Sequence, residues 1–140
     1  MIGATPFKLR PYRPFEVEEQ IALMRYAAIQ ARADYRWGIL FAMTNGMAAS
    51  SIRAAAQAKQ AGLKRGVPDL FLPVPISPWA GLFVEMKRLD GRPSDLSPEQ
   101  RDWLLRLQGQ GYQAVVAYGW RAAVAEISAY LENLVQKENV

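Results

Sequence analysis

The chain contains no cysteine and no histidine among its 140 residues, and this double absence is the strongest constraint on its fold. Without thiols it forms no disulfides, and without thiols or imidazoles it lacks the usual ligands of structural zinc. Its stability must therefore come from a hydrophobic core. A chain of this length can bury one, and 51% of its residues are hydrophobic, so we expect a single globular domain.

The same absence restricts the chemistry that the chain can perform. Ser-His-Asp and Cys-His mechanisms need an imidazole base, and zinc hydrolases commonly hold their metal through histidine. Catalysis would rest on carboxylates, lysine, hydroxyl groups or a metal held by oxygen ligands, which favours Mg²⁺ or Mn²⁺. The net charge of +4 suits a polyanionic partner, but by itself it is too small to identify one.

Residue patterns also predict the location and the boundaries of the domain. No apolar run reaches the roughly 18–20 residues of a membrane span, and residues 1–10 lack a signal-peptide pattern. We therefore expect a cytoplasmic protein with no membrane partner. Residues 1–15 place prolines among basic side chains, which predicts an extended basic arm. Residues 16–135 form the predicted domain, and residues 136–140 a C-terminal tail.

Apolar spacing and turn residues predict eight elements in the order helix, strand, helix, strand, strand, helix, strand, helix. The first helix carries an apolar stripe made of Val17, Ile21, Met24 and Ala28. Because these spacings place the four side chains on one face, we expect that face to be buried. The other predicted helices cover 48–61, 97–109 and 121–135, and the predicted strands cover 37–43, 69–74, 82–87 and 112–118, with a turn at Asn45-Gly46.

Two carboxylates and one lysine stand out in the predicted strands. Side chains alternate along a strand, so Glu85 and Lys87 share a face. If 69–74 and 82–87 pair as a hairpin, Asp69 reaches the same region. Two carboxylates and a backbone carbonyl can hold Mg²⁺, and a nearby lysine can orient water or stabilise phosphate charge. The pattern E-x-K is common, however, and also fits a solvated strand face with a weak ion pair.

Several ordered motifs resemble the VRR-NUC family of virus-type replication-repair nucleases, which belongs to the PD-(D/E)XK superfamily. The similarity covers roughly residues 16–131. Its motifs are an acidic residue and a glutamine in the first helix, Asn45-Gly46, G-V-P-D at 66–69, E-x-K at 85–87, S-x-x-Q at 97–100 and G-Y at 111–112. The resemblance implies an α/β fold with a mixed central sheet flanked by helices, in the restriction-endonuclease-like style.

The resemblance also implies roles for particular residues. Asp69 and Glu85 would be metal ligands, the Met86 carbonyl a further ligand, and Lys87 the catalytic lysine. The cofactor would be Mg²⁺ or Mn²⁺. The S-x-x-Q motif adds Gln100, although Gln100 can equally cap the helix that begins after Ser97.

The family further places a glutamate and a glutamine of the first helix near the metal. At 100° per residue, Gln20 lies about 60° and Glu16 about 100° from the centre of the apolar stripe. Glu19 lies nearly opposite the stripe and is expected to face water. Glu16, as a possible further metal ligand, and Gln20 are therefore the predicted site residues. A first-turn acid such as Glu16 can also simply complement the helix dipole.

The function implied by the resemblance is hydrolysis of DNA phosphodiester bonds. Stand-alone members resemble Holliday-junction resolvases that act as homodimers, which suggests a branched DNA substrate and a role in DNA repair in a bacterial or phage-infected cell. The alternatives are a nickase or flap nuclease of looser specificity, and a catalytically silent DNA-binding module. Trp79, in the proline-rich loop, could stack on a base or pack against a second subunit. Side chains that could contact phosphate, or be ordinary surface charges, are Lys59, Lys64, Arg65 and Arg92.

Overall fold

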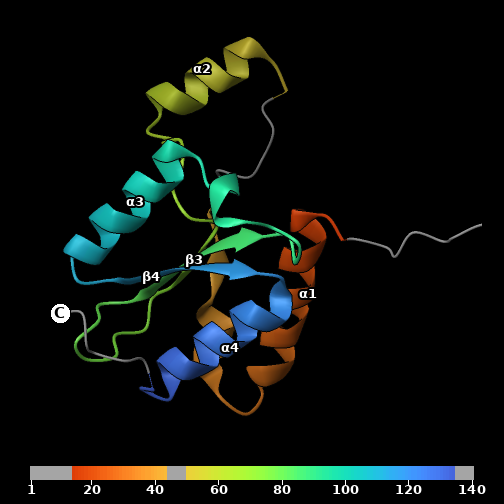
Figure 1. Cartoon of the computed structure of the whole chain (residues 1–140), viewed down its shortest axis with the longest axis vertical. Helices are drawn as coiled ribbons and strands as arrows, with labels where there is room; N and C mark the ends of the chain where they lie inside the picture. Colours follow the sequence, from red (N-terminus) through yellow and green to blue (C-terminus); the bar gives the residue numbers. More distant parts are fainter. Residues whose placement is uncertain (1–13, 44–49, 135–140) are drawn as a thin grey trace, which may run out of the picture.

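The computed structural model describes residues 14–43 and 50–134. Within them, four strands form one sheet in the order β1-β2-β3-β4 (Figure 1). The strands are β1 (Phe41–Ala42), β2 (Leu70–Leu72), β3 (Leu82–Lys87) and β4 (Gln113–Tyr118). The pairs β1/β2 and β2/β3 are antiparallel and β3/β4 is parallel, so the predicted mixed sheet is confirmed. Most of the basic arm, the Asn45-Gly46 turn and the C-terminal tail lie outside the described residues.

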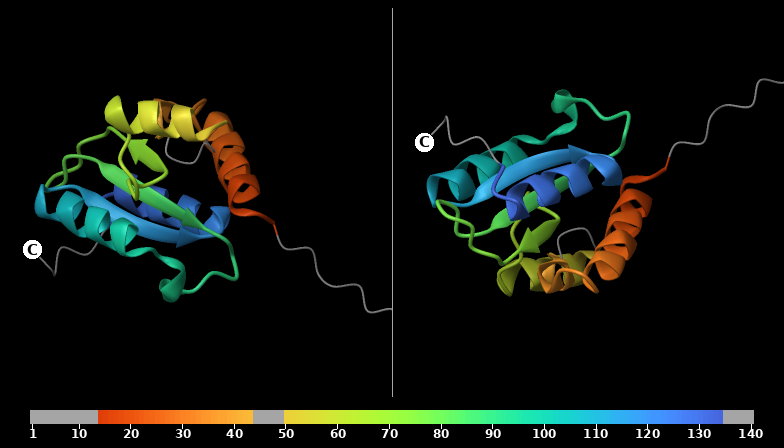
Figure 2. Two further views of the ribbon diagram at one scale, coloured as in Figure 1. Left: turned by 90° about the horizontal axis from the view of Figure 1, so that it is seen from above. Right: turned by 90° about the horizontal axis from the view of Figure 1, so that it is seen from below.

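Helices cover both faces of this sheet (Figures 1 and 2). They are α1 (Glu16–Gln30), α2 (Ile52–Gln60), α3 (Pro98–Gly109) and α4 (Trp120–Leu131), with short 3-10 helices η1 (Tyr35–Ile39) and η3 (Pro93–Asp95). The main core lies between the sheet and α1 and α4, where Leu23 and Ile127 are fully buried. A second core joins Phe83 to Leu104 beneath α3. No helix of the described chain is long and apolar enough to span a membrane.

Strand β3 is the centre of the molecule, and all six of its residues are buried. Its even-numbered side chains, such as Val84 and Met86, belong to the main core. Phe83 faces the other way into the second core, so Glu85 and Lys87 follow it on the α3 side of the sheet. The chain passes from β3 through α3 to the parallel strand β4, a crossover that parallel pairing requires.

The hairpin and the start of α3 agree with the predictions. Strands β2 and β3 pair with Leu70 opposite Val84. The capping box of α3 is complete, because the Gln100 amide donates to Ser97 Oγ at 3.1 Å and the Ser97 amide donates to Gln100 Oε1 at 2.9 Å.

Trp79 packs against the main core, so its ring serves the fold of this chain.

The predicted strand over 37–43 is mostly wrong. Its first half is η1, which begins after Asp34, whose carboxylate accepts the Arg36 amide at 3.1 Å. This cap winds the chain and turns Trp37 inward, where its ring meets Tyr26 edge-on at 5.5 Å. Only the two residues of β1 form a strand of the sheet.

The predicted buried face of α1 is also wrong. Val17 is 62% exposed and Ile21 46% exposed, whereas Glu19, Leu23 and Ala27 are buried. The opposite face of α1 packs against the core instead, where it buries Leu23 and Ala27. On that face the Glu19 carboxylate accepts a hydrogen bond from the Trp120 amide of α4 at 2.6 Å. A buried carboxylate with a dedicated donor is tolerated.

We predict that Gly66→Ala destabilises the fold more than Gly62→Ala. Both glycines have positive φ, +89° and +103° respectively, so alanine strains the backbone by about 1–3 kcal/mol at either site. Only at Gly66 would the new Cβ also lie 2.7 Å from the Glu99 carbonyl carbon and 2.9 Å from the Gln100 amide nitrogen. Urea unfolding of the two variants measures the difference, and equal losses would show that the close packing of Gly66 on α3 is dispensable.

Candidate active site

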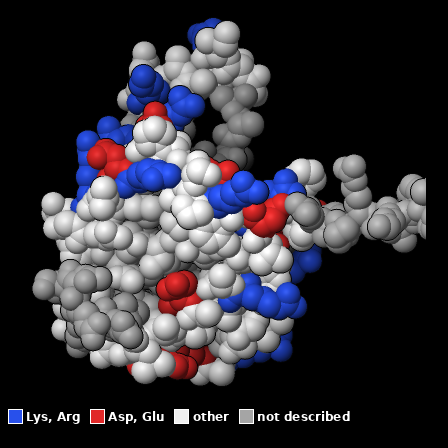
Figure 3. All heavy atoms as spheres, in the orientation of Figure 1, with Lys and Arg blue, Asp and Glu red and all other residues white. Residues whose placement is uncertain are grey.

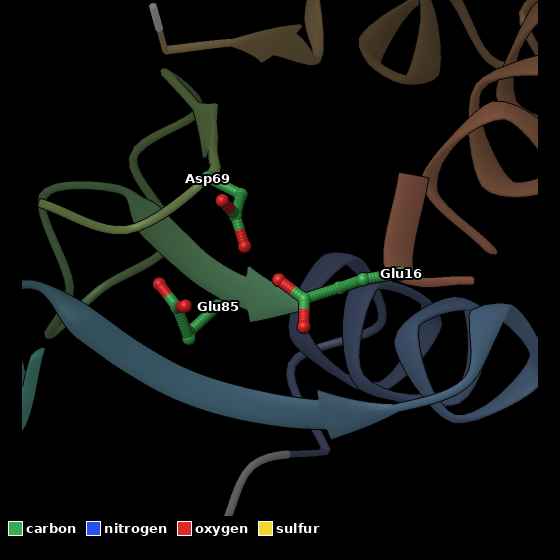
Figure 4. A group of neighbouring side chains, drawn as sticks. All are labelled: Glu16, Asp69 and Glu85. Atoms are coloured by element: carbon green, nitrogen blue, oxygen red, sulfur yellow. The ribbon is translucent and has the colours of Figure 1, made fainter. Parts of the chain in front are cut away.

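Three carboxylates converge at one place in the structure (Figure 4). Glu16, Asp69 and Glu85 each offer one oxygen, and these three oxygens lie within 4.8 Å of one another. Glu16 begins α1, Asp69 directly precedes β2, and Glu85 lies in β3. The cluster therefore exists only because three separate segments meet at the same end of the sheet.

Asp69 is held in the cluster by β3. The β2/β3 ladder ends at Leu70 opposite Val84, and the next free amide on β3, that of Met86, donates to Asp69 Oδ2 at 2.7 Å. Beyond the last backbone pair of β2 and β3, the Asp69 side chain thus takes the place of a backbone acceptor for β3. This bond places the carboxylate directly beside Glu85.

Glu85 and Lys87 are both turned toward α3, where they meet Gln100. Gln100 Nε2 donates to Glu85 Oε1 at 2.7 Å, and Lys87 Nζ donates to Gln100 Oε1 at 3.3 Å. Lys87 Nζ is also 3.7 Å from Glu85 Oε1. The side chains of Glu85 and Lys87 are only 2% and 9% exposed. The pair is therefore not a solvated strand face, and Gln100 contacts the cluster while it also caps α3.

Burial raises the pKa of all three carboxyl groups. Burial and the neighbouring Asp69 raise the pKa of Glu85 to about 8, although Lys87 opposes the change. Burial also raises the pKa of Asp69 against the Met86 amide and Lys87, and it raises the pKa of Glu16 against Lys87. Lys87 and, at Glu16, Arg88 oppose these rises without cancelling them, so the cluster favours either protons or a bound cation.

An open pocket of about 320 Å³ adjoins the cluster. Its lining residues are Glu16, Lys87, Arg88, Asp90, Gly91 and Asp95. Two members of the cluster region, Glu16 and Lys87, thus border space that a ligand can enter. The site is buried at its base and accessible from one side.

Gln20 is the predicted site residue that the structure does not bring into this network. It lies one turn after Glu16 on α1, hence on the same side of the helix, and it is half-buried. Within the described part of the chain it makes no hydrogen bond to the three carboxylates. Its role at the site stays a prediction.

Sequence reasoning missed Glu19, which anchors α1 beside the site. Helix α4 begins after Gly119, which has no side chain with which to cap it, and the Glu19 carboxylate accepts the Trp120 amide instead. The Gly119 amide donates to the Lys87 carbonyl at 2.9 Å. Two consecutive residues thus tie the start of α1 to the end of β3. The signal in the sequence was a helix start without a capping side chain.

Comparison with known proteins identifies the family. The profile of the VRR-NUC domain matches residues 22–121, and the chain belongs to this family. A solved structure described as a VRR_NUC domain protein is similar to it, with a TM-score of 0.69 and 26% identity over 86% of this chain and 91% of the other. No curated protein matches the chain.

Family membership confirms the expected fold and has a functional consequence. The VRR-NUC domain implies a nuclease-type function, with DNA as the substrate. Asp69, Glu85, Lys87 and Gln100 all lie within the matched segment, whereas Glu16 and Gln20 precede it. The position of Glu16 in the site therefore rests on the geometry of the cluster.

We predict that, without added divalent cations, the protein becomes less stable as the pH rises from about 5 to about 8. The folded-state pKa of Glu85, about 8, exceeds its ordinary value of 4.5, so the folded protein retains a proton that the unfolded chain has lost. This contribution is complete below pH 4.5 and disappears as the pH passes 8. Urea unfolding in EDTA measures it. Glu85→Gln should flatten the profile, and an unchanged slope in that variant would contradict the assignment.

Proposed function

We propose that this protein is a metal-dependent DNA endonuclease that hydrolyses phosphodiester bonds with Mg²⁺ or Mn²⁺. Asp69, Glu85 and Glu16 would hold the ion. The observation that carries the proposal is the convergence of these three carboxylates within 4.8 Å of one another, beside the buried ammonium group of Lys87.

The donors fit a hard divalent cation. All three are carboxylate oxygens, which Mg²⁺ and Mn²⁺ prefer, and burial raises the pKa of each, with the charge of Asp69 adding to the rise at Glu85. The Met86 carbonyl is also well placed. In an extended strand the N–H and C=O of one residue point to the same side, and the Met86 amide points at Asp69. Its carbonyl therefore lies on the Asp69 side and can serve as a fourth ligand.

The chain's own groups prepare the site for phosphate chemistry. Mg²⁺ bound there would supply a Lewis acid that lowers the pKa of water and neutralises phosphate charge. Gln100 holds Glu85 and Lys87 together through its amide, donating to one and accepting from the other. Lys87 borders the open pocket, so its ammonium group can donate to a phosphate oxygen or orient water. Because the Lys87 side chain is buried and bonded to Gln100, its ammonium group is already held in place and needs little movement during the reaction.

A catalytically silent DNA-binding module is the rival interpretation. Such a module has no physical need to bury Glu85 beside Asp69, because burial and the charge of Asp69 both disfavour ionisation of Glu85. The arrangement is unfavourable for the empty fold and useful only when a cation binds. We therefore favour the nuclease.

We predict that DNA cleavage requires Mg²⁺ or Mn²⁺ and is abolished by EDTA. Asp69→Asn and Glu85→Gln should each lower kcat by at least about 10²-fold, because each removes a charged metal ligand. Lys87→Gln should lower kcat by about 10²–10⁴-fold with little effect on DNA binding, as expected of a group that acts on the transition state. Asp102→Asn, on the exposed side of α3, is the matched control and should retain full activity. Full activity in EDTA would exclude the metal mechanism.

We further propose that the enzyme is a homodimer that prefers branched DNA, in the manner of a Holliday-junction resolvase of a bacterial or phage-infected cell. Symmetric cleavage of a four-way junction needs two active sites, which a two-fold dimer of single-site chains supplies. The outer face of α1 offers an apolar surface for pairing, because Val17 and Ile21 are 62% and 46% exposed there. A single unpaired chain would instead favour the nickase or flap-nuclease alternative.

We predict that Ile21→Asp converts a dimer into a monomer and lowers junction cleavage more than nicking of linear duplex. Ile29→Asp is the matched control. Ile29 is 61% exposed on the same helix, but lies about 80° away around the helix axis, so its substitution should leave the mass unchanged. Light scattering coupled to size exclusion reports the mass, and junction, flap and linear DNA report the preference. A wild-type monomer that cuts all three equally would overturn the resolvase proposal.

A further inference from the structure

Helix α2 and the loop that follows it, residues 52–65, project from the body of the protein (Figure 1). We refer to this segment as the α2 arm. None of the nine residues of α2 is buried, and Ile52 is 92% exposed. Isolated helices shorter than roughly 12–15 residues are marginal in water. A short helix without packing of its own is therefore suited to contact something outside the fold.

The charge of the α2 arm is entirely positive. Its four cations, all exposed, are Arg53, Lys59, Lys64 and Arg65. It contains no acidic residue, and within the described residues its cations form no ion pair. They equal the net charge of +4 of the whole chain, so the other residues together are balanced in charge. Figure 3 shows Lys and Arg side chains gathered at this end of the molecule.

The base of the α2 arm is fixed to the active site. Gly66 directly follows the arm, and its backbone packs so closely on Glu99 and Gln100 that a Cβ would lie 2.7–2.9 Å from them. Gln100 contacts Glu85 and Lys87, and Asp69 follows Gly66 by three residues. A ligand held by the arm is consequently held at a defined position relative to the three carboxylates.

We propose that the α2 arm binds the phosphate backbone of the DNA next to the cleavage site. This inference rests on the proposed function, because it takes the DNA bound by the arm to be the substrate of the nuclease. Unpaired Lys and Arg side chains are the usual partners of DNA phosphates. The short alanine side chains between them on α2 leave the helix surface open to a close approach. The arm would position the duplex, and the carboxylate cluster would cut it.

Charge decides between DNA and a second copy of the chain as the occupant. Two α2 arms packed together across a two-fold axis would bring eight like charges together without any acidic side chain of the arms between them. Repulsion of that kind disfavours pairing. A phosphate backbone is instead attracted, and its bound counterions are released on contact.

The test compares two charge-matched double variants. Lys64→Gln/Arg65→Gln removes two cations at the base of the arm, and Arg25→Gln/Arg32→Gln removes two exposed cations from the far half of α1 and the turn after it. Fluorescence anisotropy measures binding to a labelled linear duplex and a four-way junction, in EDTA and over a range of KCl. We expect the arm variant to bind at least about 10-fold more weakly at low salt. The slope of log K against log salt should fall by roughly 2 in magnitude, with little change in the control.

The outcomes separate this proposal from the nuclease proposal, because binding in EDTA does not require cleavage. Weaker binding by the arm variant alone supports the arm, even if the wild-type protein cuts no DNA with any metal. Equal binding by the two double variants overturns it, even if the wild type is an active nuclease. A change in the mass of the arm variant with unchanged DNA binding would also overturn it, since the arm would then contact a second copy. Unchanged thermal unfolding of both variants verifies that the fold is intact.

Discussion

The structure depends on packing three carboxylates together at the end of a central strand, where Glu85 is fully buried beside the Lys87 ammonium group and Glu16 and Asp69 are partly buried. Burying like charges close together is unfavourable, and for this reason burial and the neighbouring Asp69 raise the pKa of Glu85 to about 8. The surrounding contacts reduce this cost: the Met86 amide donates to Asp69, and Gln100 donates to Glu85. The remaining imbalance suits a divalent cation. The features that weaken the empty fold are therefore the ones that would make it bind metal.

Three anchors hold the separate segments of the site in register. The Gly119 amide donates to the Lys87 carbonyl, and the adjacent Trp120 amide donates to Glu19, which sets the start of α1 and hence Glu16. Gly66 packs against the first turn of α3, which aligns the segment before Asp69 with Gln100. None of these anchors belongs to the carboxylate cluster. The geometry of the site thus depends on hydrogen bonds and close packing of residues outside the carboxylate cluster.

Local signals in the sequence predicted those parts of the fold that depend on neighbours along the chain. The capping box at Ser97, the hairpin across the proline-rich loop and the shared face of Glu85 and Lys87 all follow from short-range geometry. The apolar stripe of α1 led to a wrong prediction of the buried face, because a hydrophobic face in the sequence does not show which part of the protein it packs against. It remains exposed at Val17 and Ile21, the surface on which our dimer proposal rests.

The sequence by itself determined the available chemistry, because a chain without histidine or cysteine has only oxygen ligands and lysine for a metal-assisted hydrolysis. It also predicted that Asp69 and Glu85 meet if segments 69–74 and 82–87 pair as a hairpin, and the structure shows that pairing. The sequence also favoured Glu16 over Glu19, but on the premise that the apolar stripe of α1 is buried, which is wrong; only the tertiary structure brings Glu16 to Asp69 and Glu85. That placement depends on the rotation of α1, which is set by the Trp120 amide, 101 residues from Glu19. A contact so distant leaves no periodic trace in the sequence, because the free energy that selects it comes from the packing of two helices.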